Sequence, residues 1–210
     1  MAAFFFFIQI NMKIIIVGAS GTLGSKISEE LGKRHDIVKV GSKSGAFQAD
    51  ITSSDSIKSF YKKVGSFDAL VSATGSGHFG PFDQMTEDDF YKGIKSKMMG
   101  QINLVMLGKD HINENGSFTL TSGILHNDPV PGSVGLSFVN GALNSFVVAA
   151  ANELKRGIRL NVVSPGLVED SVEALGAYFP RHVPVRMSRM VSGYLKSVEG
   201  NITGKVIEIV

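Results

Sequence analysis

Apolar residues along the chain follow two alternating patterns. Short runs rich in β-branched residues, typical of strands buried on both faces, occur at residues 13–17, 37–40, 69–73, 117–121, 159–163 and 205–210. Between several of these runs apolar residues recur at helical spacing, which predicts helices at residues 22–32, 52–64, 86–107 and 141–154. Strands that alternate with helices predict a parallel sheet with crossover helices. The expected fold class is α/β, a single-domain doubly wound parallel sheet in three α/β/α layers.

Polar residues support two of the helix starts and leave one segment unassigned. A Thr/Ser/Asp group opens the helix at 52–64, and Thr86 with Asp89 forms a capping box for the next one. Residues 181–190 (RHVPVRMSRM) are irregular and basic. We expect them to form a lid over the carboxyl edge of the sheet.

Composition narrows the classes of function. The 210 residues are 43% apolar and 19% charged, which predicts one folded domain with a sizeable core. The formal charge is +2, so we expect no nucleic-acid partner. The chain has no Cys, which excludes disulfides and is compatible with the cytoplasm. Its five His include no pair at i, i+4, so no metal site is expected.

The amino terminus carries an apolar run, AAFFFFIQI, at residues 2–10. The run lacks a positive segment before it and a cleavage site after it, and it passes almost directly into the first strand. We therefore expect neither a signal peptide nor a membrane anchor. Residues 1–11 are predicted to be a loosely packed extension, and residues 12–210 the domain.

A glycine-rich turn follows the first predicted strand and opens the first predicted helix. Its residues have the spacing G-x-x-G-x-x-G and are Gly18, Ala19, Ser20, Gly21, Thr22, Leu23 and Gly24. Glycines permit a tight turn and a close approach to a pyrophosphate, and the helix start attracts its negative charge. In this context the turn predicts a dinucleotide site. The alternative is a glycine-rich turn without a ligand.

The loop after the second predicted strand bears on the choice of cofactor. An NAD-binding fold places an acid there to bind the ribose 2′-hydroxyl, whereas this chain has Gly41, Ser42, Lys43 and Ser44. One cation and two hydroxyls suit a 2′-phosphate, so NADP(H) is preferred over NAD(H). The alternative is a lysine that is simply solvated.

These two loops and three further segments resemble the short-chain dehydrogenase/reductase family. The further segments are Ala49-Asp50-Ile51-Thr52, Val71-Ser72-Ala73-Thr74-Gly75 and Leu160-Asn161-Val162-Val163-Ser164-Pro165-Gly166. The resemblance runs from Met12 to Val210 and implies a Rossmann-like fold that binds NAD(P). It also implies a homodimer or homotetramer, in which helices 86–107 and 141–154 pair with those of another copy.

The resemblance assigns cofactor contacts to individual residues. Asp50 would bind the adenine amino group, and Ile51 follows it in the same cofactor segment. The cofactor ribose would be lined by Ala73, Thr74 and Gly75. The nicotinamide would be approached by Pro165, Gly166 and Leu167.

The family's catalytic set of Asn, Ser, Tyr and Lys is incomplete in this chain. Alignment places Leu136 at the Tyr position and Asn140 at the Lys position, and no Tyr lies between Tyr91 and Tyr178. Ser122 matches the family's serine, and Lys97 stands at the Asn position. Lys97 reaches the cofactor ribose or the space of the missing lysine, or it extends to solvent.

Loss of the tyrosine removes the usual proton donor, which costs about 10²- to 10⁴-fold in rate. His126 is the preferred replacement, with Tyr178 and His182 as alternatives, although a loop histidine is also a common surface residue. The expected function is an NADP(H)-dependent oxidoreductase acting on a small carbonyl or alcohol. Two alternatives remain open, a non-catalytic NADP(H) sensor or assembly subunit and a nucleotide-binding fold that takes no nicotinamide.

Overall fold

The computed structural model describes residues 11–43 and 45–210. In this part of the chain, seven strands form one sheet in the order β3-β2-β1-β4-β5-β6-β7, and every neighbouring pair is parallel. The strands are β1 (Lys13–Val17), β2 (Asp36–Gly41), β3 (Phe47–Gln48), β4 (Phe67–Ser72), β5 (Ile112–Thr121), β6 (Arg159–Pro165) and β7 (Val206–Ile209). The predicted doubly wound parallel sheet is confirmed.

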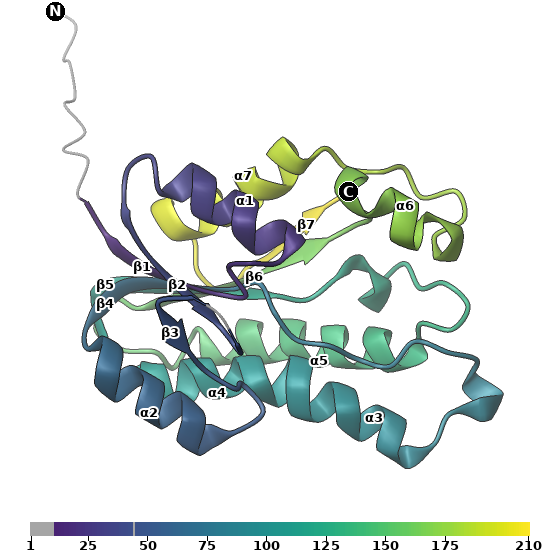
Figure 1. Cartoon of the computed structure of the whole chain (residues 1–210), viewed down its shortest axis with the longest axis horizontal. Helices are drawn as coiled ribbons and strands as arrows, with labels where there is room; N and C mark the ends of the chain where they lie inside the picture. Colours follow the sequence, from purple (N-terminus) through teal and green to yellow (C-terminus); the bar gives the residue numbers. More distant parts are fainter. Residues whose placement is uncertain (1–10, 44) are drawn as a thin grey trace, which may run out of the picture.

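Helices cover both faces of the sheet (Figure 1). The helices are α1 (Thr22–Leu31), α2 (Ser54–Val64), α3 (Glu87–Gly93), α4 (Met99–Gly108), α5 (Val134–Ala150), α6 (Val172–Leu175) and α7 (Met187–Glu199). Figure 1 shows α1 and α7 on one face and α2, α4 and α5 on the other, with α6 at the right-hand end. The three α/β/α layers are therefore as predicted.

The core consists of two clusters, one on each face of the sheet. Along β1, Ile14 and Ile16 pack in the cluster with α1 and α7, while Ile15 and Val17 pack in the other with α2 and α5. All four side chains are buried. The period-2 alternation of a strand explains why a central strand is apolar on every residue.

The strand order places a crevice at the carboxyl ends of β1 and β4. The chain leaves β1 toward β2 and later enters β4 on the other side of β1, so the connections run in opposite directions from this point. Ligands of open α/β sheets bind at such a switch point. The fold therefore directs attention to the loops after β1, β2 and β4.

Two predicted helices differ in extent from the structure, and one strand was not predicted. The expected helix at 86–107 is divided by a π-helical turn at Ile94–Met98. The helix expected to begin at residue 141 begins at Val134, with Ser133 as its N-cap residue. The short strand β3 was not predicted, since two residues carry no readable period.

The predicted lid also differs in its second half. Residues from Met187 onward belong to α7, whose buried face includes Met190, Val191, Tyr194 and Val198. This spacing is helical and is a signal that the sequence contains. Only the part before Met187 is irregular, with a parallel bridge between Val168 and Val185.

Residues 1–10 of the predicted extension lie outside the described residues. Asn11 is described, and its side-chain amide donates to Asp36 Oδ2 over 3.0 Å. Among the described helices, none has the length and apolar character needed to cross a membrane.

Candidate functional site

The glycine turn after β1 is closed by two glycines that admit no side chain. Gly18 has φ +85°, and a Cβ there would overlap the carbonyl oxygen of Ala73 at the end of β4. A Cβ at Gly24 would overlap the carbonyl oxygen of Gly18 itself. The Gly18 N–H donates to the Val40 carbonyl over 2.8 Å. These two glycines are required by the packing of the turn against β2 and β4.

The middle glycine has a different role. A Cβ at Gly21 would meet nothing closer than the Gly18 carbonyl oxygen at 3.4 Å, an ordinary contact. Gly21 is the N-cap of α1, no side chain caps this helix, and its first turn has no acidic residue. The helix start therefore combines free N–H groups, a positive dipole end and open space above Gly21, which together suit a phosphate.

A cavity of about 510 Å³ opens at this turn and follows the carboxyl ends of β1, β2 and β4. Nine of its lining residues are predicted cofactor contacts: Gly18, Ser20, Gly21, Ser42, Asp50, Ile51, Ala73, Thr74 and Gly75. The remaining lining residues, to which the sequence assigned no cofactor contact, are Val17, Gly41, Ala49, Thr52, Ser76 and Ser96. The structure thus brings residues of four predicted segments, 18–24, 42–44, 50–51 and 73–75, into one cavity.

The other predicted cofactor contacts lie around or beyond this cavity. Ala19 is buried below the turn, and Thr22 and Leu23 begin α1. Lys43 is exposed beside Ser42, and Ser44 lies outside the described residues.

Asp50 presents a fixed carboxylate at the cavity wall. Its Oδ1 accepts from the Thr52 N–H over 2.9 Å and from the Thr52 hydroxyl over 2.7 Å. These two hydrogen bonds lower the pKa of the Asp50 carboxyl. Among the described residues no donor contacts Oδ2, so this oxygen can accept a hydrogen bond from a ligand.

The segment predicted to approach the nicotinamide lies farther along the same edge. Pro165 ends β6, which is three strands from β1, a distance of about 14 Å. Gly166 and Leu167 line a separate cavity of about 430 Å³ together with His182. A ligand that contacts both α1 and Leu167 must therefore cross the carboxyl ends of four strands.

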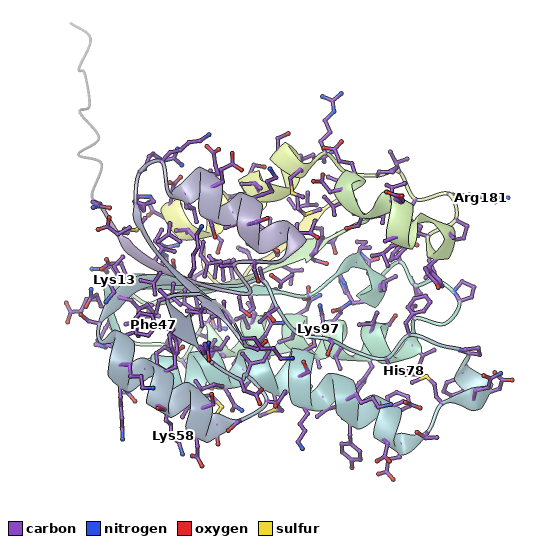
Figure 2. All side chains as sticks on the ribbon, in the orientation of Figure 1. Lys13, Phe47, Lys58, His78, Lys97 and Arg181 are labelled. Atoms are coloured by element: carbon purple, nitrogen blue, oxygen red, sulfur yellow. The ribbon has the colours of Figure 1, made fainter. Side chains whose placement is uncertain are left out.

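Lys97 lies directly beside this path, in the π-helical turn between α3 and α4. Gly75 has φ +108°, and a Cβ there would come within 2.7 Å of Lys97 Cα and 3.2 Å of its Cγ. Lys97 is half-buried and has no ion-pair partner among the described residues. Burial lowers the pKa of its ammonium to about 8. Figure 2 shows Lys97 in the middle of the molecule, between Lys13 and Arg181.

Gln101 is a site residue that the sequence interpretation missed. Its side-chain NH₂ donates to the Lys97 carbonyl over 3.1 Å and to the Thr121 carbonyl over 2.8 Å. Its Oε1 accepts from the Thr121 N–H over 2.9 Å. A buried glutamine in an otherwise apolar helix was the available signal. It ties the turn that carries Lys97 to the strand end that carries Ser122.

Ser122 and the two family positions on α5 meet at this strand end. Ser122 and Asn140 are each 2% exposed, and neither Ser122 Oγ nor Asn140 Oδ1 has a partner among the described residues. The Asn140 amide lies against Gly123, where a Cβ would come within 2.9 Å of Nδ2. Leu136, one turn earlier, contacts Gly77. Buried polar atoms without partners are rare and point to a bound water or ligand.

His126 lies on a 3-10 turn after β5. Its Nδ1 is 3.0 Å from the Gly123 carbonyl, and its Nε2 is 3.5 Å from Glu208 Oε1 on β7. Both neighbours are acceptors, so the imidazole must break a contact before it serves a substrate. The structure therefore groups Ser122 with Asn140 and leaves His126 on the β7 side. Lys97 is connected to the Ser122 strand end through Gln101.

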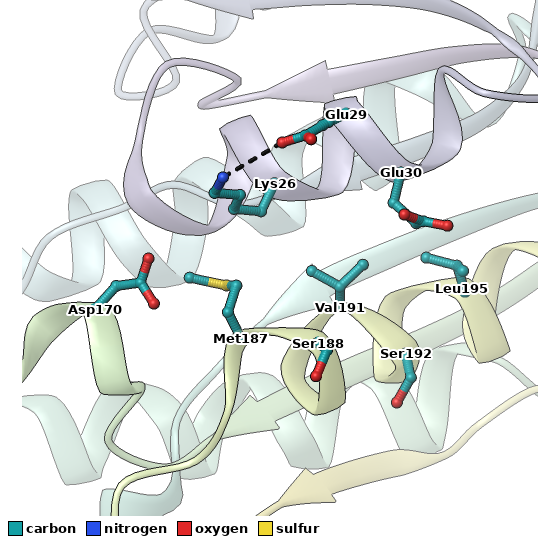
Figure 3. A pocket seen from close by; sticks show the side chains of 9 residues that line it. All are labelled: Lys26, Glu29, Glu30, Asp170, Met187, Ser188, Val191, Ser192 and Leu195. Carbon is teal, nitrogen blue, oxygen red and sulfur yellow. Dashed lines mark hydrogen bonds and ion pairs between the residues drawn. The ribbon is translucent and has the colours of Figure 1, made fainter.

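A third cavity, of about 580 Å³, lies between α1 and α7 (Figure 3). Its walls carry the ion pair of Lys26 with Glu29, at 3.3 Å, and the apolar side chains of Met187, Val191 and Leu195. None of the predicted cofactor or catalytic residues lines it. In the described residues there is also no group of three or more side chains able to hold a metal ion.

Comparison with known proteins agrees with this geometry. The family model described as enoyl-(acyl carrier protein) reductase matches residues 18–182, from the first glycine into the lid. The chain is a member of the short-chain dehydrogenase/reductase family. An uncharacterized oxidoreductase of Methylorubrum extorquens is 28% identical over 178 residues, which cover 73% of this chain and 72% of the relative.

Solved structures share the whole fold of this chain. The protein lin1944 from Listeria innocua is 44% identical, with a TM-score of 0.94, over 95% of this chain and all of that chain. A small-chain dehydrogenase in complex with NADPH is 23% identical, with a TM-score of 0.84, over 95% of this chain and 97% of that chain. The latter likeness supports the fold.

Proposed function

We propose that this short-chain dehydrogenase/reductase is an NADP(H)-dependent oxidoreductase that interconverts a small carbonyl compound and its alcohol. The main observation in support of this proposal is the open space at Gly21, at the start of α1. The turn needs glycine at 18 and 24 for its own packing, whereas Gly21 leaves open space at an uncapped helix start that borders the 510 Å³ cavity. This combination suits a pyrophosphate at that end of a dinucleotide.

The remaining cofactor contacts follow from the walls of the cavity. Asp50 Oδ2 accepts a hydrogen bond from the adenine amino group, and Ala73, Thr74 and Gly75 border the ribose. Outside this cavity, farther along the same edge of the sheet, Pro165, Gly166 and Leu167 meet the nicotinamide at the end of β6. When bound, the nicotinamide cofactor supplies or takes up a hydride.

The preference for NADP(H) rests on the loop after β2. Within the described residues 41–43, the loop has no carboxylate to bind a ribose 2′-hydroxyl or repel a phosphate. Ser42 borders the cavity, and Lys43 is exposed beside it. A hydroxyl and a cation at this place favour a 2′-phosphate. A structural neighbour of this chain was solved in complex with NADPH.

Ser122 and Lys97 serve the substrate side. The Ser122 hydroxyl is buried without a partner, so it can donate to a carbonyl oxygen at no cost in internal hydrogen bonds. Lys97 adds a positive charge next to Gly75. A positive charge that is shielded from water stabilises a nearby developing negative charge more strongly than one in solvent does. In the proposed assignment, Ser122 orients the small-molecule substrate and Lys97 stabilises the negative charge that develops on its oxygen. His126 can act as a proton donor to the substrate only if its contacts with Gly123 and Glu208 are broken.

A second candidate function is a non-catalytic NADP(H) sensor or assembly subunit. The observation that favours it is the replacement of the family's Tyr and Lys by Leu136 and Asn140 on the inner face of α5. This candidate predicts tight binding of NADPH and no oxidation of it by any carbonyl.

A homodimer or homotetramer is proposed from the outer face of α4 and α5. Met106, Phe138 and Val148 are 52%, 47% and 49% exposed on these two helices. Apolar side chains gathered on neighbouring helices are typical of a protein interface. The resemblance to the family also implies that this face pairs with the same face of another copy. Sedimentation of the wild type and of a Phe138→Glu variant tests this pairing.

The proposal is tested by calorimetric titration of NADPH and NADH into the protein, followed by absorbance of the reduced nicotinamide with a panel of aldehydes, ketones and quinones. Tighter binding of NADPH together with carbonyl-dependent oxidation is the expected result. Binding without oxidation supports the second candidate, and absence of binding contradicts both.

A further inference from the structure

A histidine and an aspartate meet in the loop between β4 and α3. His78 Nδ1 lies 3.2 Å from Asp89 Oδ1, with the two side chains 28% and 12% exposed. His78 lies on the same side of the molecule as Arg181 and opposite Lys13, the first residue of β1 (Figure 2). The pair therefore lies toward the carboxyl side of the sheet.

The Asp89 carboxylate is firmly held. Oδ2 accepts from the Thr86 N–H over 3.0 Å and from the Thr86 hydroxyl over 2.8 Å, and Oδ1 accepts from Lys92 Nζ over 2.7 Å. The Lys92 ammonium and these two hydrogen bonds hold the pKa of the Asp89 carboxyl well below its usual range. A fixed, charged carboxylate orients the imidazole.

The other ring nitrogen is free for a substrate. Nε2 of His78 has no hydrogen-bond partner among the described residues, in contrast to His126. A Cβ at Gly80 would come within 2.7 Å of Nε2, so this edge of the ring packs against the Gly80 backbone, where only a glycine fits. One nitrogen is thus oriented and the other is unoccupied, as a proton donor requires.

The loop that carries His78 packs on the part of α5 where the family has its tyrosine. A Cβ at Gly77 would come within 2.7 Å of Leu136 Cδ2, and one at Gly135 within 3.0 Å of the His78 carbonyl oxygen. Asn140, one turn of about 5–6 Å farther along α5, contacts Gly123 next to Ser122. The His78 loop and Ser122 therefore lie about one helical turn apart on the same stretch of α5.

The same loop reaches the lid. The ring of Phe79 contacts the ring of Tyr178 edge-on, with centroids 5.1 Å apart. Gly80 N–H donates to the Gly132 carbonyl over 2.9 Å. The loop that carries His78 is thus held between the start of α5 and Tyr178, which precedes the predicted lid.

We propose that His78, oriented by Asp89, is the proton donor to the substrate oxygen in place of the family's tyrosine. The inference rests on the oxidoreductase function proposed above. As the carbonyl carbon gains a hydride with its two electrons, the Nε2–H bond breaks and an O–H bond forms. The Nδ1–H group keeps its hydrogen bond to Asp89 throughout. After the alcohol leaves, Nε2 takes up a proton from water. In alcohol oxidation the same nitrogen accepts the proton.

The activity test compares His78→Ala with His111→Ala. His111 is a matched control because it stacks on Tyr61 near β5, outside the cavity of the cofactor. His78→Ala should lose about 10²- to 10⁴-fold in turnover, keep its NADPH affinity within about twofold and regain activity when imidazole is added. A loss that imidazole does not restore, or no loss at all, overturns the role of His78. Inactivity of the wild type with NADPH bound overturns the proposed function itself.

A second measurement needs neither cofactor nor turnover. Diethyl pyrocarbonate modifies unprotonated, accessible imidazole nitrogens, and the modified residues are located by mass spectrometry. His78 should react faster than His35, whose Nδ1 accepts from the Met12 N–H and whose Nε2 faces Glu199 at 3.1 Å. Equal or slower modification of His78 shows that Nε2 is not free and contradicts the proposal even in an active enzyme.

Discussion

The side-chain amide of Gln101 and the peptide group of Thr121 form a reciprocal pair of hydrogen bonds, 2.8 and 2.9 Å long. The same amide also holds the Lys97 carbonyl. One buried glutamine thus couples the π-helical turn after α3 to the end of β5. Because the turn carries Lys97 and Ser122 follows the strand, this coupling sets the position of both proposed substrate contacts.

The three glycines of the turn should respond differently to alanine. Gly21→Ala places its methyl group in open space at φ −78°, so the midpoint of thermal unfolding should stay unchanged while NADPH affinity falls at least about tenfold. Gly18→Ala meets the Ala73 carbonyl at φ +85° and should lower stability by about 1–3 kcal/mol. Calorimetric titration and thermal unfolding of both variants test this contrast. Unchanged NADPH affinity in Gly21→Ala would show that the turn is purely structural.

Reversal of charge at Lys43 tests the choice of cofactor. Lys43→Glu places a carboxylate beside a ribose 2′-phosphate, so NADPH affinity should fall by about tenfold or more while NADH affinity changes little. Lys58→Glu is a suitable control, since Lys58 is an exposed lysine of α2 outside the cavity lining. Both affinities are measured by calorimetry. Equal losses for NADPH and NADH would remove the argument for the 2′-phosphate.

The buried ammonium of Lys97 should give the stability a measurable pH dependence. Its pKa is about 8 in the folded protein against 10.5 for an ordinary lysine, so between these two values the unfolded chain binds more protons. The contribution of Lys97 to the free energy of unfolding should therefore rise with pH from about 8 to 10.5. Urea unfolding of wild type and Lys97→Met across this range isolates the contribution. A constant difference between the two proteins would show that the ammonium is solvated.

Two buried serines of the same strand region provide a matched pair. Ser117 and Ser122 are 1% and 2% exposed, and the hydroxyl of each lacks a partner in the described part of the chain. Replacement of either by alanine loses no hydrogen bond and should leave the free energy of unfolding within about 1 kcal/mol of the wild type. Only Ser122→Ala should lower turnover, by about 10-fold or more, because only Ser122 lies at the carboxyl edge. Equal turnover in the two variants would exclude contact between Ser122 and the substrate.

Patterns within single elements were sufficient for most of the fold. The apolar run of β1, the capping box at Thr86 and the glycine turn after β1 all occur where their local signals predicted them. Each depends on residues within one turn or strand, which the sequence displays directly. The elements that the sequence did not predict were also missed for local reasons. Strand β3 has only two residues, and the start of α5 contains Gly135, which is unfavourable in a helix.

The relationships between elements could not be predicted in this way. His126 was the preferred proton donor by its chemistry, yet its two ring nitrogens face Gly123 and Glu208, and the latter is 82 residues away in sequence. His78 was only one of five histidines until Asp89 was found beside it. Hydrophobic periodicity shows which face of an element is buried and carries no information on which side chain of another element it meets.

The sequence by itself determined the parallel sheet, the glycine turn and most of the residues that line the 510 Å³ cavity, because these depend on strand periodicity and on glycines whose backbone freedom is local. The tertiary structure alone decided which polar groups meet at the carboxyl edge. Parallel strands bring distant loops together there, and burial at that edge is what leaves Ser122 without a partner, lowers the pKa of Lys97 and joins His78 to Asp89.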